Sequence, residues 1–265
     1  MNNPKNIFPL LESKKIHIPE WSMDKPKEPK KWLVKSINSA GGISVQKACL
    51  FDKKINEDFF YQKFSGGNNI SIQFEVLNSE PKILLACNQW LYPIKNFPFL
   101  LGGIISTNLN FEIFLKIKRI LKKLCELLDF NGLNSIDFLI KKNTPLVIDI
   151  NPRPGLAINM LYRIYRNSLF KKKKYLINSK KFYCSSIVYS DKTIMFDKNK
   201  FKIVEDLSRS KNFSELPTKD CIIKNNQPIC VVHSSSFSQT CARLRVEKLS
   251  KFILNKLTNK KNIND

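Results

Sequence analysis

Short apolar runs, many of them alternating with polar residues, extend along much of the first half of the chain. Alternation with a period of two indicates β-strands, because successive side chains point to opposite faces of a sheet. The pattern predicts strands at residues 32–34, 43–45, 59–64, 70–76 and 82–90. Residues 65–69, Ser-Gly-Gly-Asn-Asn, are typical of a hairpin turn between two of these strands. Residues 1–30 are rich in Pro and Lys and predict an extended linker.

Residues 111–128 follow a different period. Apolar residues recur there at spacings of three and four, with basic residues between them, which is typical of an amphipathic helix. The pair Asn131-Gly132 predicts the end of this helix. The apolar stripe predicted to face the core consists of Phe111, Phe114, Ile117, Leu121, Leu124, Cys125 and Leu128.

Two further strands are predicted at residues 133–140 and 146–150. If the turn between them is centred on Asn143, Asp137 faces Asp149 and Ser135 faces Asn151 across the strand pair. The opposite face of the pair is then wholly apolar. It carries Ile136, Phe138, Ile140, Leu146, Ile148 and Ile150.

The remainder of the chain, residues 171–265, contains no recognisable catalytic constellation. Short strands are predicted at residues 182–189, 193–196 and 229–232, and a basic helix at residues 242–257. The lysine run at residues 171–174 is typical of a solvated loop or helix end.

Composition excludes several classes of protein. The chain has 265 residues, and 43% of them are hydrophobic, which is enough for a buried core. Lys and Arg number 45 against 22 Asp and Glu, so the formal net charge is +23. Sites that read nucleic acids tend to use Arg, whereas nearly all the basic residues here are Lys. With no nucleic-acid-binding motif in addition, we expect no specific nucleic-acid binding.

The seven cysteines and two histidines show no metal-binding spacing and no Cys-X-X-Cys pair. An odd number of cysteines without a secretion signal indicates reduced thiols. No apolar run approaches the roughly 20 residues that a membrane-spanning helix needs. We therefore expect a soluble cytoplasmic protein that does not associate with membranes.

The predicted Asp137–Asp149 pair places two negative charges directly opposite each other, which destabilises a sheet unless something compensates. A proton held on one carboxylate, a Lys or Arg between them, or a divalent cation would do so. Asn151 adds a neutral oxygen on the same face, and such oxygen ligands suit Mg²⁺. Acid–base catalysis of the glycosidase type is the competing use of two carboxylates.

Lys35 ends a predicted strand and precedes a loop of small and polar residues, 36–42. Such a loop can bind phosphate groups through its backbone N–H groups and the single lysine charge. It is not a Walker A motif, because no Gly-Lys-Ser/Thr sequence ends it. The alternative is a surface lysine before an ordinary turn.

In combination, these motifs resemble those of the ATP-grasp superfamily of carboxylate–amine ligases. The resemblance spans roughly residues 15–165, and its most specific part is Asp149-Ile-Asn-Pro-Arg-Pro-Gly155. It implies an α+β fold in which two α+β lobes grip ATP. The other matching segments are residues 32–35, 39–42, 61–64 with Gly67, and 133–137. Matches at residues 98–103, 187–189 and 228–231 resemble a branch that accompanies tetrahydromethanopterin- and methanofuran-linked one-carbon metabolism and is related to tyramine–glutamate ligases.

The resemblance also implies a role for each matching residue. Lys35 would bind the α- and β-phosphates of ATP, and Arg153 the reacting phosphoryl or carboxylate group. The backbone that would bind the β- and γ-phosphates belongs to Ser39, Ala40, Gly41 and Gly42. The strand that would line the adenine carries Gln62, Lys63 and Phe64. The ligands of Mg²⁺ or Mn²⁺ would be Asp137, Asp149 and Asn151.

The implied activity is that of an ATP- and Mg²⁺-dependent ligase joining a small carboxylate to an amine through an acyl phosphate. The alternative is a catalytically reduced ATP-grasp module that binds nucleotide or a partner. Asp149 stands where the family usually has Glu, and the N-terminal α/β domain of the family is expected to be reduced or missing. A homo-oligomer or a partner chain would then replace that domain.

Four segments are expected from this comparison. They are an N-terminal remnant and linker (1–30), a small lobe (31–80), a large lobe with the metal site (81–170), and a C-terminal extension that packs on the large lobe (171–265).

Overall fold

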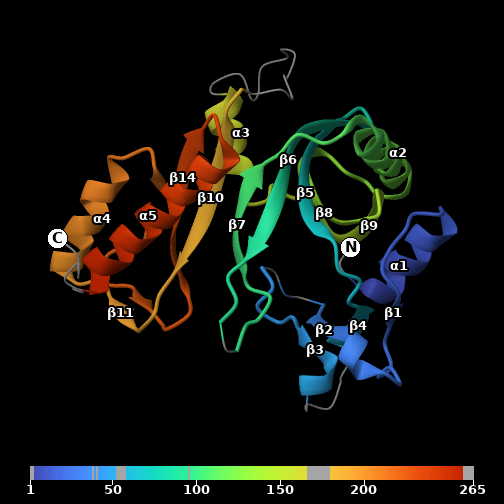
Figure 1. Ribbon diagram of the computed structural model, residues 1–265, viewed down its shortest axis with the longest axis horizontal. Helices are drawn as coiled ribbons and strands as arrows, with labels where there is room; N and C mark the ends of the chain where they lie inside the picture. Colours follow the sequence, from blue (N-terminus) through green and yellow to red (C-terminus); the bar gives the residue numbers. More distant parts are fainter. Residues whose placement is uncertain are drawn as a thin grey trace. The chain divides into compact units, whose positions relative to one another are not determined.

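The computed structural model describes residues 3–37, 39, 41–51, 58–94, 96–165 and 180–258 (Figure 1). The chain forms two compact units. Unit 1 comprises residues 1–101 and 107–178, and unit 2 comprises residues 102–106 and 179–265.

A small antiparallel sheet of unit 1 has the strand order β1-β4-β2-β3. The strands are β1 (Trp21–Ser22), β4 (Phe59–Lys63), β2 (Trp32–Ser36) and β3 (Gln46–Lys47), with 3-10 turns at Pro29–Lys31 and Ala48–Leu50. Its core consists of Trp32, Val34, Ala48 and Tyr61. The strand predicted at residues 43–45 is wrong, because those residues lie in or beside a turn and pairing begins at Gln46.

A second antiparallel ladder of unit 1 has the order β6-β5-β8-β9. Its strands are β6 (Glu80–Leu91), β5 (Asn68–Leu77), β8 (Gly132–Lys141) and β9 (Thr144–Asn151). The hairpin predicted across residues 65–69 is wrong, because β4 and β5 belong to different sheets. Gly66 and Gly67 both have positive φ there, and a Cβ on Gly67 would lie 2.6 Å from the Ile140 carbonyl oxygen. This glycine pair therefore carries the chain from one sheet to the other.

Two helices pack around the second ladder. α2 (Phe111–Leu127) confirms the predicted helix, and the Asn110 side chain caps it by accepting a hydrogen bond from Ile113 N. The buried stripe is shifted from the prediction, since Ile113 is buried whereas Phe111 is 74% exposed. α1 (Pro4–Ser13) corrects the linker predicted at residues 1–30, because Asn3 caps a helix that begins with proline.

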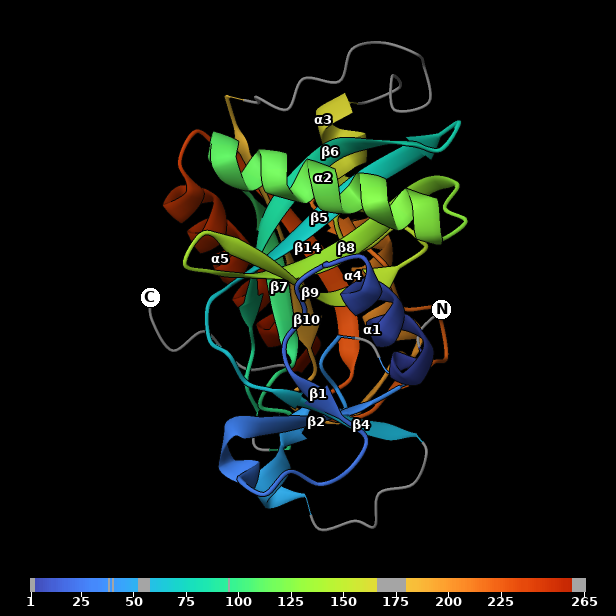
Figure 2. The same ribbon diagram turned by 90° about the vertical axis from the view of Figure 1, so that its right-hand side faces the viewer.

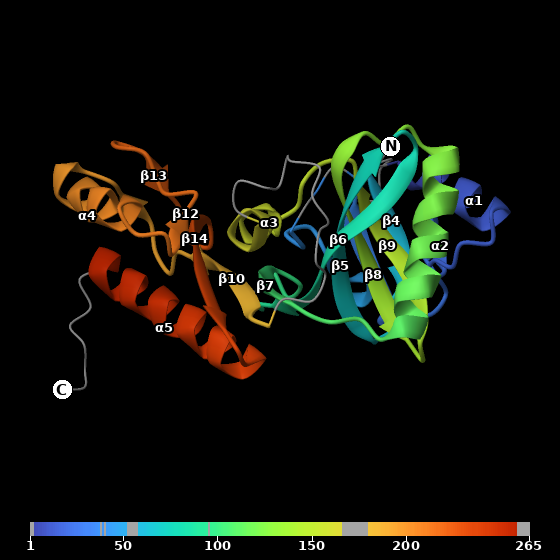
Figure 3. The same cartoon turned by 90° about the horizontal axis from the view of Figure 1, so that it is seen from above.

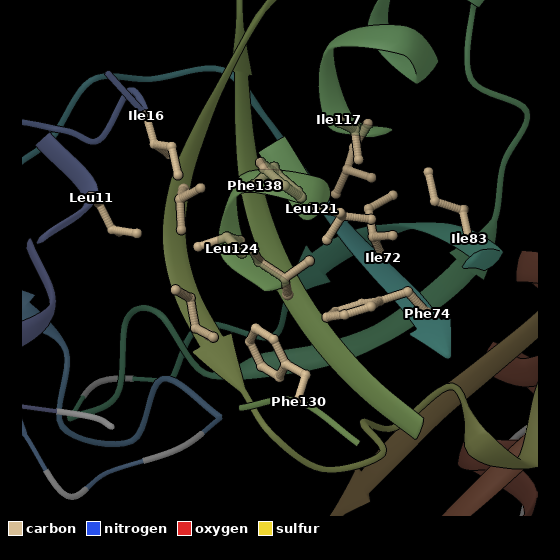
Figure 4. Close-up of a cluster of buried hydrophobic side chains, with 14 of the residues drawn as sticks. Leu11, Ile16, Ile72, Phe74, Ile83, Ile117, Leu121, Leu124, Phe130 and Phe138 are labelled. Atoms are coloured by element: carbon tan, nitrogen blue, oxygen red, sulfur yellow. The ribbon is translucent and has the colours of Figure 1, made fainter. Parts of the chain in front are cut away.

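The main core of unit 1 lies between α2 and the ladder, which α2 crosses (Figure 2). Ile117, Leu121 and Leu124 of α2 meet Ile72 and Phe74 of β5 and Phe138 of β8 (Figure 4). Leu11 and Ile16 extend the same cluster from the α1 segment. One face of the ladder is thus fully occupied by packing, which leaves the other face for polar side chains.

The β8–β9 hairpin confirms the predicted pairs Asp137–Asp149 and Ser135–Asn151, but its register near the turn differs from the prediction. Its turn has two residues, Lys142 and Asn143, both with positive φ, so pairing near the turn is offset by one from the prediction. A β-bulge restores the predicted register by leaving Ile148 as an extra residue in β9.

The bulge changes which β9 residues face the core. Val147 pairs with Phe138 and belongs to the core cluster, together with Ile136 and Ile150. Leu146 and Ile148, which the prediction placed on the apolar face, are absent from that cluster among the residues described.

Unit 2 has the ladder order β12-β14-β10-β7, formed by β12 (Phe213–Ser214), β14 (Pro228–Ser236), β10 (Phe182–Tyr189) and β7 (Leu101–Ser106). α5 (Gln239–Thr258) packs along β10 and β14 (Figure 3). The predicted strands and the basic helix of this region are confirmed apart from small shifts in their bounds. The remaining elements are α4 (Lys198–Ser208), β11 (Ile194–Met195) and β13 (Ile222–Ile223).

α3 (Ile158–Tyr165) follows β9 in unit 1, and its Tyr165 hydroxyl donates a hydrogen bond to the Leu84 carbonyl oxygen of β6. Within the described ranges, no helix has both the length and the apolar character that crossing a membrane requires.

We predict that, because of the bulge, Val147 contributes more than Ile148 to the free energy of unfolding. Val147→Ala should lower the free energy of unfolding by about 1–3 kcal/mol, because the side chain is 1% exposed. Ile148→Ala, the matched control on the same strand, should cost less than about 1 kcal/mol. Urea unfolding compares the two variants, and a larger loss for Ile148→Ala would contradict the bulged register.

Candidate functional site

A cavity of about 710 Å³ in unit 1 is lined by both sheets of that unit. Ligand sites for small molecules typically have volumes of this order. Ala40 lies outside the described residues, but the structure brings every other predicted site residue to this cavity. These lining residues are Lys35, Ser39, Gly41, Gly42, Gln62, Lys63, Phe64, Asp137, Asp149, Asn151 and Arg153.

The Asp137–Asp149 pair lies on the cavity side of the β8–β9 hairpin. Burial, and after it the negative charge of Asp149, raise the pKa of Asp137 to about 6. Hydrogen bonds from Ser71 and Gln89 and the charge of Lys35 act in the opposite direction. The Gln89 Nε2 donates to Asp137 Oδ1 at 3.0 Å. Asp137 is thus a carboxylate whose charged form lacks sufficient compensation in the protein alone.

Lys35 approaches the acidic pair from β2 of the small sheet. Its Nζ donates to the Gln62 Oε1 at 2.6 Å. Burial lowers the pKa of the Lys35 ammonium, and the charges of Asp149 and Asp137 counteract that shift. The Nε2 of Gln62 is buried and has no hydrogen-bond partner among the residues that the structure describes. The cavity therefore contains a half-buried cation and a buried amide group next to each other.

The loop after Lys35 is held against the segment that precedes β7. The Leu101 N–H donates to the Gly41 carbonyl at 2.9 Å. Gly41 and Gly42 have φ values of +67° and +79°. A Cβ on Gly42 would lie 1.9 Å from the Phe99 carbonyl oxygen, whereas a Cβ on Gly41 would meet nothing within 4 Å. Only glycine fits at position 42, because a side chain would collide with the backbone there.

Part of the cavity lining is aromatic. Phe64 is 59% exposed and contacts Phe99, with ring centroids 6.1 Å apart. Lys63 points to Glu20 and forms an ion pair with it at 2.5 Å. A cavity that combines an exposed aromatic side chain with charged groups suits a ligand with a flat apolar part and an anionic part.

Arg153 lies in the turn that follows β9, and its side chain is exposed. Its guanidinium donates to the Pro154 carbonyl at 3.3 Å, and its own carbonyl accepts a hydrogen bond from Ser135 Oγ at 3.2 Å. The backbone of this turn is thus anchored while the charged group remains at the cavity.

The donor set at the acidic pair fits a hard divalent cation. In the described part of the chain, no group of three or more His, Cys, Asp or Glu side chains could hold a metal. Two carboxylates and the Asn151 amide are present instead, with Asn151 Nδ2 donating to Asp149 Oδ2 at 2.9 Å. Mg²⁺ is typically held by one or two protein carboxylates together with substrate phosphates, so the set suits a cation that arrives with a nucleotide.

Sequence reasoning missed three contributors to the site, namely Gln89, Ser71 and Phe99. Gln89 and Ser71 hydrogen bond to Asp137, and Phe99 abuts Gly42. The sequence does indicate Ser71. Polar residues alternate with apolar residues along β5, and Ser71 is one of the polar residues. The contact of Phe99 joins segments nearly sixty residues apart, and no local pattern indicates it.

The chain belongs to the ATP-grasp domain family, whose model matches residues 4–156, more than half of its length. Its fold, with mixed helices and sheets, is the ATP-grasp fold.

An uncharacterized protein of Methanocaldococcus jannaschii is 26% identical over 249 residues, which are 86% of this chain and 57% of that protein. The chain thus spans little more than half the length of this relative. The structure of the L-amino acid ligase of Bacillus licheniformis matches with a TM-score of 0.67 and 16% identity, covering 94% of this chain and 70% of that chain. The carboxyaminoimidazole ribonucleotide synthase of Aspergillus clavatus, solved with ATP, matches with a TM-score of 0.70 and 10% identity, covering 97% and 73%.

We predict that the two glycines of the loop respond differently to the same substitution. Gly41→Ala should lower the free energy of unfolding by about 1 kcal/mol, the usual cost of a side chain at positive φ. Gly42→Ala should cost about 2–4 kcal/mol, because the added methyl group must displace the Phe99 backbone. Equal losses in urea unfolding would show that the loop does not rest on Phe99.

We also predict a pH-dependent effect of Asp137→Asn in the presence of a chelator. The folded-state pKa of about 6 lies above the ordinary aspartate value of 3.8, so protonation favours folding and wild-type stability falls as the pH rises from about 4 to 6. Asn cannot ionise, so the variant should be more stable than wild type by roughly 1–2 kcal/mol at pH 8, after discounting for partial solvent access, and by less at pH 5. A variant that is less stable at pH 8 would contradict the raised pKa.

Proposed function

We propose that this chain is an ATP- and Mg²⁺-dependent ligase that joins a small carboxylate to an amine through an acyl-phosphate intermediate. The observation that carries the proposal is the convergence of a half-buried lysine, a glycine loop, two carboxylates with an asparagine, and an arginine on one cavity. Phosphoryl transfer from ATP needs this combination of positioned positive charge and backbone donors.

The nucleotide would lie with its phosphates at the charged end of the cavity. Lys35 and the backbone N–H groups of the 39–42 loop would hold the phosphates, and the aromatic end near Phe64 would hold the base. Gln62 supports this placement, because its unpaired amide donor would gain an acceptor from the ligand.

Mg²⁺ would be held by Asp137, Asp149 and Asn151 together with phosphate oxygens, and it would neutralise phosphate charge there. The raised pKa of the Asp137 carboxyl group supports this assignment, because a cation would favour the ionised carboxylate. Asp149 differs from the family's usual Glu by one methylene group.

The proposed reaction has two steps. A substrate carboxylate oxygen attacks the γ-phosphorus, the bond to the β–γ bridging oxygen breaks, and ADP leaves. The amine nitrogen then attacks the acyl carbon and expels phosphate. Arg153 is placed to contact the transferring phosphoryl group and then the developing oxyanion, since its guanidinium is held at the cavity by an anchored turn.

Finer parts of the proposal rest on the motif matches at residues 98–103, 187–189 and 228–231. They support a role in one-carbon cofactor biosynthesis, and we propose amino-acid-sized substrates. We also propose a cytoplasmic location and no specific nucleic-acid partner. The seven cysteines are free thiols, which suits a reducing compartment.

The decisive assay measures ADP formation from Mg-ATP with mixtures of amino acids and amines. The proposal requires ADP formation that depends on both a carboxylate and an amine and is abolished by Arg153→Ala. Mg-ATP binding without ADP formation from any mixture would favour the alternative, a catalytically reduced nucleotide-binding module. Absence of Mg-ATP binding would contradict both.

We predict that Lys35→Ala weakens Mg-ATP binding by about 10- to 150-fold, or about 1.5–3 kcal/mol, because one charge-assisted phosphate contact is lost. Lys47→Ala is the matched control, since Lys47 lies on neighbouring β3 and is exposed outside the cavity. Calorimetric titration should show no change for Lys47→Ala. Unchanged affinity in Lys35→Ala would move the phosphate site elsewhere.

A further inference from the structure

Gln73 is a polar residue whose side chain is buried. It lies on β5 between Ile72 and Phe74, which both belong to the core, and it is itself only 2% exposed. Glutamine is seldom fully buried unless its amide group is hydrogen bonded. The polar contacts of Gln73 therefore indicate why it is there.

Both the oxygen and the nitrogen of the Gln73 side-chain amide make hydrogen bonds. The Oε1 accepts a hydrogen bond from the Gly155 N–H at 3.1 Å, and the Nε2 donates to Ser71 Oγ at 3.3 Å. Ser71 in turn hydrogen bonds to Asp137, its cross-strand partner. A single buried amide thus joins the turn after β9 to a carboxylate of the proposed metal site.

A second buried side chain holds the same turn. Ser135 is 3% exposed, pairs with Gln73 across the ladder, and donates to the Arg153 carbonyl at 3.2 Å. The turn lies close to both side chains, since a Cβ on Gly155 would be 3.1 Å from Gln73 Nε2 and from Ser135 Oγ. The backbone on each side of Pro154 is therefore anchored to the sheet.

We propose that Gln73, assisted by Ser135, is a positioning residue that fixes the Arg153–Gly155 turn in one arrangement. The inference rests on the proposed function, because Arg153 is the group being positioned. Gln73 does not touch the nucleotide phosphates in this account and acts through the residues that do.

The test uses Gln73→Met, which keeps the side-chain length and removes both hydrogen bonds. Gln89→Met is the matched control, because Gln89 contacts Asp137 but makes no hydrogen bond to the turn in the part of the chain described. The probes are Mg-ADP and Mg-ADP with aluminium fluoride, which imitates the transferring phosphoryl group, and binding is measured by calorimetry.

Gln73→Met should weaken binding of the aluminium fluoride complex at least tenfold and binding of Mg-ADP less than threefold. Combining Gln73→Met with Arg153→Ala should add little to the loss caused by Arg153→Ala alone, because both changes remove the same contact. Losses from Gln89→Met and Arg153→Ala should multiply instead. Multiplying losses for Gln73→Met and Arg153→Ala would overturn the proposal.

A second readout needs no nucleotide. The Gly155 amide should exchange its hydrogen at least tenfold faster in Gln73→Met than in wild type, and within twofold of wild type in Gln89→Met. Equal protection in all three proteins would overturn the positioning role. If wild type does not prefer the aluminium fluoride complex to Mg-ADP, the proposed function fails, and the Gly155 exchange decides the positioning of the turn by itself.

Ser135→Ala covers the case in which Gln73→Met does not fold. It removes one hydroxyl and leaves the volume nearly unchanged. It should weaken binding of the aluminium fluoride complex several-fold and, like Gln73→Met, add little to Arg153→Ala. Losses that multiply in this pair would equally overturn the proposal.

Discussion

Two carboxylates held opposite each other on one sheet face are the constraint on which the arrangement of unit 1 depends. Asp137 and Asp149 are cross-strand partners, and the like charges and burial together raise the pKa of Asp137. Such a pair opposes folding unless neighbouring groups compensate for it. Lys35 and Gln89 provide part of the compensation, and a divalent cation with a nucleotide would provide the rest.

The two faces of the ladder β6-β5-β8-β9 have different roles, one in stability and one in the proposed chemistry. One face packs against α2 through residues such as Ile72, Phe74 and Phe138. The other carries buried polar side chains, among them Gln73 and Ser135, which are connected to the turn after β9. The apolar face supplies the packing energy that allows the polar face to hold like charges and buried amides in place.

The sequence predicted most strands, the long helix and the facing aspartates, because these depend on local periodicity. It predicted the aspartate pairing with a turn that is wrong by one residue, and the bulge at Ile148 compensated for that error. Bulges and two-residue turns differ from regular strands at single positions, so the alternation of apolar residues does not reveal them. The helix at residues 4–13 was missed because its two prolines, together with the Pro and Lys residues that follow it, resembled a linker.

The candidate site was predicted residue by residue from the ATP-grasp resemblance, and the structure places the described members around one cavity. The supporting residues were not predicted. Gln89 reaches Asp137 across 48 positions of sequence, and Gln73 reaches Gly155 across 82. Such contacts follow from strand order and register, which a single sequence determines only through the packing of the whole sheet.

The central claim is that the acidic pair binds a cation together with ATP. Calorimetric titration of ATP, with Mg²⁺ and with a chelator, tests it most directly when wild type is compared with Asp149→Asn. We expect Mg²⁺ to strengthen ATP binding to wild type at least about tenfold and to have little effect on the variant. Equal affinities with and without Mg²⁺, or the same Mg²⁺ dependence in Asp149→Asn, would contradict the claim.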